Sequence, residues 1–213
     1  MNLKMEKINI MPQTIYKFQS DKSLLSEALK NVKNLTKWRQ NNHNQTSFDY
    51  TLLKREEYHN LFKWISDCLN FVVKDLDYQC DGMTVTQSWA NKSDHNQWHH
   101  THTHSNSIIS GIYYLTDSDC STWFAVKNIW QFNGVICLNT MDNLDENKCL
   151  KNSIIIHKEK SEAGKLLLFP SNLEHSVCTN MSEEPRYTIS FNSFPVGELG
   201  RWDYLNRLNL FPL

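Results

Sequence analysis

Histidines gather in one short stretch of this sequence. Five of the nine histidines fall within the ten residues HNQWHHTHTH, at positions 95 to 104. On an extended strand, residues two apart point to the same side, about 6.6 Å apart along the chain, so their imidazoles can converge on one ion at about 2.0–2.2 Å. His100, His102 and His104 would share one such face, with His99 on the other. This spacing predicts a metal-binding site.

A later segment offers the ligand from elsewhere in the chain that would close such a site. His175 lies in GKLLLFPSNLEHSVCTN, just after an apolar run and a turn marked by Pro170. Further on, Arg186 opens the run RYTISFN, whose alternation places Arg186, Thr188, Ser190 and Asn192 on one face and apolar residues on the other. An arginine on such a strand is costly unless an anion meets it. We therefore expect an anion close to Arg186.

Each of these residues also has a simpler interpretation. A histidine-rich tract can be a solvated loop, and His175 can be a hydrogen-bonded residue of the core or of the surface. Arg186 can pair with Glu183 or Glu184 just before it. The set is more informative than its members, because imidazoles at strand spacing, a distal imidazole and an arginine follow one another in a fixed order.

Helical periodicity dominates the first eighty residues, and strands follow. Between residues 20 and 40, and again from residue 52 to just before Asp81-Gly82, apolar residues recur every three or four positions. After Gly82 the period changes to two, in short runs rich in β-branched and aromatic residues. Helices first and strands after predict an α+β fold with helices against one sheet. The strand-like runs are 83–89, 107–115, 122–130, 134–140, 153–157, 165–169 and 186–192.

Composition narrows the class of protein further. The 22 basic and 23 acidic residues give a net charge of −1, so charge-driven binding to membranes or duplex nucleic acid is not expected. No apolar run approaches the ~20 residues of a membrane span. The opening residues contain no apolar signal-peptide core, and none of the six cysteines forms a two-residue-gap motif. These features favour a reduced, cytoplasmic protein.

Taken in order, the motifs resemble those of the iron(II)/2-oxoglutarate-dependent oxygenases. The segments HTHSNSIISGIYYL, GKLLLFPSNLEHSV and EEPRYTISFNSF carry the resemblance, which covers roughly residues 83 to 200. The chain is most similar to a family of such oxygenases that is frequent in marine bacteria and their phages. The matching positions are His102, His104, Asn106, Ser107, Ser110, Gly111, Tyr113, Tyr114, Phe169, Pro170, Ser171, His175, Arg186, Ser190, Phe191 and Asn192.

This resemblance implies a double-stranded β-helix, a distorted jelly roll of the cupin-like kind, with N-terminal helices packed on the major sheet. We expect one domain over residues 1–213. Within it, helical support would cover 14–80, the β-helix core 83–194 and a C-terminal tail 195–213.

The resemblance also implies an iron(II) site in which His102, His104 and His175 are the metal ligands and catalytic residues. Most members of the superfamily have His-x-Asp followed by a distal histidine, whereas His104 stands here in place of the carboxylate. Three neutral imidazoles leave the site more positive than a site with two histidines and one carboxylate. Asp94, His100 or a water are the alternatives for the third ligand.

For the cosubstrate, the resemblance implies that 2-oxoglutarate chelates the iron and that Arg186 grips its distal carboxylate with two parallel hydrogen bonds. Thr188 and either Tyr113 or Tyr114 would add hydroxyl groups, and alternation lets only one of the two tyrosines face inward. With O2, such an enzyme releases succinate and CO2 and hydroxylates a substrate, which the sequence does not identify. A homodimer is possible.

Two other functions fit the same histidines. One is a non-catalytic, cupin-like protein that binds zinc or nickel, in which Arg186 is an ordinary ion-pair residue. The other is a zinc hydrolase with an activated water, for which Glu174 is the nearest general base. The position of Arg186, followed by Thr188, favours the oxygenase.

Overall fold

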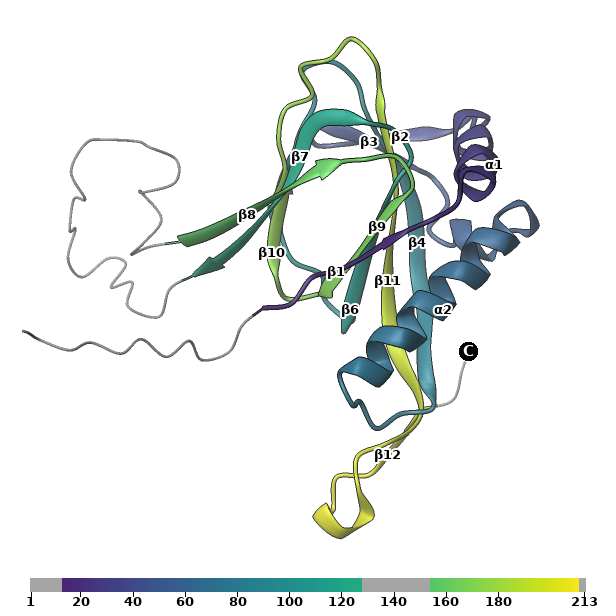
Figure 1. The fold of residues 1–213 in the computed structure, drawn as a ribbon, viewed down its shortest axis with the longest axis vertical. Helices are drawn as coiled ribbons and strands as arrows, with labels where there is room; N and C mark the ends of the chain where they lie inside the picture. The colour runs from purple at the N-terminus through teal and green to yellow at the C-terminus, as the bar shows by residue number, and fades with distance from the viewer. Residues whose placement is uncertain (1–12, 128–153, 211–213) are drawn as a thin grey trace, which may run out of the picture.

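The computed structural model describes residues 13–127 and 154–210 of the chain. Its strands form two sheets that face one another (Figure 1). The larger sheet has eight strands in the order β1-β9-β6-β11-β4-β3-β2, with β12 paired to β11. Its strands are β1 (Tyr16–Gln19), β2 (Trp38–Asn41), β3 (Asn44–Ser47), β4 (Gly82–Ser93), β6 (Ile109–Tyr114), β9 (Lys165–Pro170), β11 (Arg186–Leu199) and β12 (Leu208–Leu210).

The smaller sheet has four strands in the order β5-β10-β7-β8. They are β5 (His99–His102), β7 (Ser118–Lys127), β8 (Ile154–Ser161) and β10 (Glu174–Val177). All pairings in both sheets are antiparallel. The two facing sheets form the double-stranded β-helix that the sequence predicts. The expected strand at 134–140 lies outside the described residues.

Two helices cover the outer face of the larger sheet (Figure 1), as predicted. The first, α1 (Lys22–Lys33), begins after Asp21, whose carboxylate accepts a hydrogen bond from the backbone N–H of Leu24 at 2.8 Å. The second, α2 (His59–Asp75), buries one apolar stripe, so tertiary packing holds it in place. Neither helix, nor any other described one, is long and apolar enough to span a membrane.

The first eighty residues are less helical than predicted. Residues 38–47 form the hairpin of β2 and β3, and residues 52–58 form two 3₁₀ turns, η1 (Leu52–Lys54) and η2 (Glu56–Tyr58). A further turn, η3 (Trp202–Tyr204), follows β11. The polar sequence of β3 has little strand propensity of its own. It becomes a strand because it pairs with β4, Gln45 opposite Lys92.

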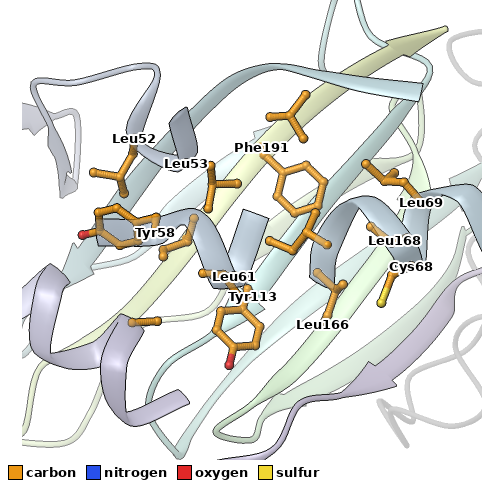
Figure 2. Packing of buried hydrophobic residues seen from close by; sticks show 14 of the residues in the cluster. Leu52, Leu53, Tyr58, Leu61, Cys68, Leu69, Tyr113, Leu166, Leu168 and Phe191 are labelled. Carbon is orange, nitrogen blue, oxygen red and sulfur yellow. The ribbon is translucent and has the colours of Figure 1, made fainter. Parts of the chain in front are cut away.

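The core has two layers, one on each face of the larger sheet. The outer layer joins α2 to the sheet: Leu61, Cys68 and Leu69 lie against Leu168 and Phe191 (Figure 2). The inner layer, between the sheets, is smaller and consists of Ile112, Tyr114, Phe124, Leu167, Phe169 and Leu173. Buried polar side chains, among them Thr122, Arg186 and Thr188, share the inner side with this smaller apolar layer.

Gly111 permits a close contact in the outer layer. It pairs with Phe191 across β6 and β11, and a Cβ on residue 111 would lie 2.1 Å from Cζ of the Phe191 ring. The absence of a side chain at this position therefore lets the phenylalanine ring lie flat on the sheet, under α2.

Candidate metal and anion site

The structure brings three histidines of the predicted site, His102, His104 and His175, close together. His102 on β5 lies directly opposite His175 on β10, and His104 follows in the turn after β5, where its backbone N–H donates to the carbonyl of Ser171 at 2.9 Å. Their ring centroids are 4.2 Å (His102–His175), 5.0 Å (His102–His104) and 5.1 Å (His104–His175) apart. One ligand atom from each lies within 4.8 Å of the others, so this inner group can hold a metal ion.

Backbone carbonyls fix the orientation of two of these rings. Nδ1 of His102 lies 2.8 Å from the carbonyl oxygen of His100, and Nδ1 of His175 lies 2.9 Å from that of Leu173. Because a carbonyl only accepts, each Nδ1 carries the proton and each Nε2 presents its lone pair. Histidines that bind metals commonly have such a hydrogen bond on the other ring nitrogen.

Burial keeps these imidazoles neutral at neutral pH. Desolvation is the main cause that lowers the pKa of His175 to about 3 and that of His104 to about 4, and it also lowers the pKa of His102. Phe169 adds an apolar wall, its ring centroid 4.9 Å from that of His175. Neutral imidazoles in a partly dry site are suited to binding a transition-metal ion.

The face on which His99 lies differs from the prediction. In the pairing of β5 with β10, His102 lies opposite His175 and His99 lies opposite Val177. The two paired positions are three residues apart on β5 but only two residues apart on β10. This β-bulge inserts one residue and turns His99 to the side of His102, so that their rings stack with centroids 4.5 Å apart. His99, His100 and His102 make up a second group whose ligand atoms lie within 4.8 Å of one another.

Asp94, an alternative third ligand, is engaged elsewhere. Its carboxylate accepts a hydrogen bond from Gln45 at 2.8 Å and pairs with Lys92 at 3.0 Å. Neither of the two groups that can hold a metal in the described parts of the chain contains a carboxylate. The inner group therefore consists of three imidazoles.

Arg186 lies buried on the inner face of β11, with 3% of its surface exposed. Its guanidinium carbon lies 5.3 Å from the centroid of the Tyr114 ring, and Nη2 donates a long hydrogen bond of 3.4 Å to the hydroxyl of Thr122. Nε has no hydrogen-bond partner, and none of the ion pairs among the described residues includes Arg186, so Glu183 and Glu184 do not neutralise it. A buried guanidinium in this state fits an anionic ligand.

The positive charge of Arg186 acts on His99 of the histidine tract. It contributes, after burial and the neighbouring imidazoles, to lowering the pKa of His99 to about 3. Thr188, two residues along β11 and also buried, accepts a hydrogen bond from Nδ2 of Asn91 at 3.3 Å. Its own O–H is therefore available to donate to an anion that Arg186 binds.

The two candidate tyrosines point in opposite directions. Tyr114 faces the inner side, where its hydroxyl donates to Thr122 at 2.7 Å. Tyr113 faces the helices: its hydroxyl lies 2.7 Å from that of Ser20, and its ring contacts Trp64. As the alternation of β6 predicts, only one of the two tyrosines faces inward; it is Tyr114, so Tyr113 is excluded from the candidate cosubstrate site.

Sequence reasoning missed two residues of the inner face, Thr122 and Lys165. Thr122 is two residues from the apolar Phe124, and Lys165 is two residues from the apolar Leu167, so strand alternation would have placed both side chains on the inner face. It would not have shown that they lie close to Arg186 and Tyr114. Lys165 lies 5.5 Å from the centroid of the Tyr114 ring, but Glu159 neutralises it at 3.3 Å. Of these two buried cations on the inner face, Arg186 is the one that pairs with no carboxylate in the described parts of the chain.

Several solved structures share this fold. The epimerase SnoN from nogalamycin biosynthesis, described as non-heme and alpha-ketoglutarate dependent, has a TM-score of 0.65 at 10% identity, over 88% of this chain and 80% of its own. HygX from Streptomyces hygroscopicus, with nickel, 2-oxoglutarate and hygromycin B bound, has a TM-score of 0.58 at 11% identity, over 86% and 83%. A prolyl-4-hydroxylase from Pseudomonas putida has a TM-score of 0.55 at 10% identity, over 84% and 92%.

At the level of sequence, no curated protein matches the chain. A family model does match, over residues 87–192, and its description is "Putative 2OG-Fe(II) oxygenase". The matched range begins in β4 and ends in β11, and it includes the inner histidine group and Arg186. The chain belongs to the 2OG-Fe(II) oxygenases, the enzymes that depend on iron(II) and 2-oxoglutarate.

Proposed function

We propose that this enzyme couples the conversion of 2-oxoglutarate and O2 to succinate and CO2 with the hydroxylation of a second substrate. His102, His104 and His175 would hold the iron, and Arg186 would hold the distal carboxylate of 2-oxoglutarate. One observation carries the proposal: the same protein has a buried guanidinium that no described carboxylate pairs with and a group of three imidazoles whose ligand atoms lie within 4.8 Å of one another.

Each inner residue has a defined part in this reaction. Bound iron(II) supplies the activation of O2 that oxidative decarboxylation requires. The Nδ1–H···O=C bonds of His102 and His175 keep both rings aimed at the metal. Arg186 and Thr188 orient the cosubstrate from its far end, and Phe169 helps to exclude water from the side of His175.

The charge balance is consistent with an all-histidine site. Three neutral imidazoles would leave a bound iron(II) with its full charge of +2, and the carboxylate of 2-oxoglutarate that is not held by Arg186 would offset part of it. The positive charge of Arg186 then adds an attraction for the dianion that no described carboxylate cancels. The cosubstrate thereby takes over part of the role of the missing carboxylate ligand.

The two alternatives receive less support. A zinc hydrolase would need Glu174 as its base, but Glu174 precedes His175 on β10, and adjacent strand residues point to opposite faces. A non-catalytic zinc or nickel protein leaves the buried Arg186 unexplained. The fold itself accepts varied ligands, since its neighbours include a structure with hygromycin B and a prolyl hydroxylase with a peptide fragment.

Anaerobic absorption spectroscopy tests the proposal. We expect a weak visible charge-transfer band when iron(II) and 2-oxoglutarate are both present, and no band with either alone. Arg186→Ala should lower the apparent affinity for 2-oxoglutarate, whereas Arg39→Ala, at an exposed arginine of β2, should not. If no band forms while zinc binds tightly and stabilises the fold, the oxygenase site is refuted.

A further inference from the structure

The inner group leaves part of the histidine tract unused. His99 and His100 are not members of it, yet together with His102 they form the second group whose ligand atoms lie within 4.8 Å of one another. Their ring centroids are 5.0 Å (His99–His100), 4.5 Å (His99–His102) and 5.4 Å (His100–His102) apart. This outer group exists because the β5 bulge turns His99 toward His102.

A buried amide supports the outer group. Asn44 of β3 is 2% exposed, its Oδ1 has no described hydrogen-bond partner, and its Nδ2 lies 3.4 Å from Nδ1 of His99. The oxygen and the NH2 group of a side-chain amide have nearly the same size, so rotating the Asn44 amide by half a turn would place Oδ1, instead of Nδ2, next to Nδ1 of His99. Nδ1 of His99 would then donate to Asn44 and Nε2 would be free for a metal, as for the inner histidines.

The two groups cannot be filled together. Nδ1 of His102 is held by the carbonyl of His100, so Nε2 is its ligand atom in either group, and one lone pair binds one ion. Two divalent cations this close would also repel each other, and neither group contains a carboxylate to reduce that repulsion.

We propose that His99, His100 and His102 form an outer position for a divalent transition-metal ion. The ion then moves to the inner position by exchanging His99 and His100 for His104 and His175, while His102 stays bound. His99, His100 and His102 are all only partly buried, whereas His175 is 3% exposed, so the exchange brings an ion from a partly exposed position into the buried site. The outer metal position is independent of the proposed reaction. Only the transfer of the ion to the inner position, which we call the handover, rests on the proposed inner iron site.

The same tract provides a matched control. His95 lies outside both groups: its Nδ1 is 3.3 Å from the carbonyl of Ser182 and 3.6 Å from the carboxylate of Glu183. Removing His95 lowers the number of histidines in the tract without touching either position. A nonspecific effect of a histidine-rich segment would respond to His95→Ala as it does to His99→Ala.

Anaerobic calorimetric titration of the metal-free protein with cobalt(II) tests the outer position. The wild type and His95→Ala should bind one equivalent. His175→Ala should still bind one equivalent, more weakly, and His175→Ala/His99→Ala should show no saturable binding. The outer position is refuted if His175→Ala alone abolishes binding, or if His99→Ala has no effect in that background. Two equivalents in the wild type would overturn the shared ligand.

The design separates this proposal from the inner iron site. If His175→Ala binds as tightly as the wild type, the inner site fails while the outer one stands. Should His175→Ala fold poorly, His104→Ala disables the same inner group at a half-buried turn residue. For the handover, His99→Ala alone should slow metal loading and release by the same factor, because the inner ligands still set the affinity. Unchanged stopped-flow rates would overturn it.

Discussion

Replacing Arg186 by methionine should raise the stability of the protein in the absence of 2-oxoglutarate and reduce the stabilisation that 2-oxoglutarate provides. Methionine keeps much of the side-chain volume and removes the charge. Arg186 is 3% exposed, its Nε has no described partner, and its bond to Thr122 is 3.4 Å long. The guanidinium therefore destabilises the empty fold, and its benefit appears only when an anion binds.

The magnitudes follow from burial. Leaving a buried polar group unsatisfied costs about 1–3 kcal/mol, so Arg186→Met should raise the free energy of unfolding of the ligand-free protein by roughly that amount. Removing one partner of a buried charged pair costs about 2–5 kcal/mol of binding, which corresponds to a roughly 30- to 5,000-fold weaker affinity for 2-oxoglutarate. At 1,000 times the dissociation constant, the cosubstrate stabilises the wild type by about 4 kcal/mol but stabilises the variant by no more than ~2 kcal/mol.

Urea denaturation with zinc(II) in place of iron, at zero and saturating 2-oxoglutarate, measures both effects in one series. Arg39→Met is the control, and it should change neither the basal stability nor the gain on adding 2-oxoglutarate. The reasoning is refuted if Arg186→Met lowers the stability of the ligand-free protein, since the guanidinium would then have partners. Equal stabilisation of wild type and variant by 2-oxoglutarate would remove Arg186 from the binding site.

Four further substitutions test three separate parts of the structure. Tyr114→Phe should weaken 2-oxoglutarate binding by roughly fivefold, about 1 kcal/mol for a lost hydrogen bond, whereas Tyr113→Phe should lower stability alone. The reverse pattern in calorimetric titrations would contradict the assignment of their faces. Gly111→Ala should destabilise the fold by about 1–3 kcal/mol, because its Cβ would meet the ring of Phe191; an unchanged melting temperature would count against this packing. Burial raises the pKa of Glu159, but hydrogen bonds from its basic neighbours have a larger opposite effect, so the net pKa is lowered. The ionised carboxylate therefore stabilises the fold at a pH above its unfolded pKa of about 4.3. This stabilisation is lost as the pH falls through the lower pKa of the folded state. Glu159→Gln should therefore lose stability at pH 7 and little at pH 3 in urea denaturation, and an equal loss at both would refute the ion pairing.

The sequence by itself determines the family and predicts which residues form the site. His102, His104, His175 and Arg186 were predicted as site residues because imidazole and guanidinium groups are rare in such an order, and strand period places each on a face. The change of period after Gly82 predicts the strands that follow it, although β1, β2 and β3 precede it. These signals are local, since they depend on residue type and on spacing within one element.

The tertiary structure decided what depends on partners distant in the sequence. The face of His99 follows from a bulge that exists only through the pairing of β5 with β10. The inward direction of Tyr114 follows from the helices that cover the other face of β6. Glu159 reaches Lys165 across the turn between β8 and β9, and Lys17 of β1 also pairs with it, whereas no described carboxylate pairs with Arg186. The bulge and the pairing with Lys17 depend on strands that lie far apart in the sequence, so the spacing of residues within one element does not reveal them.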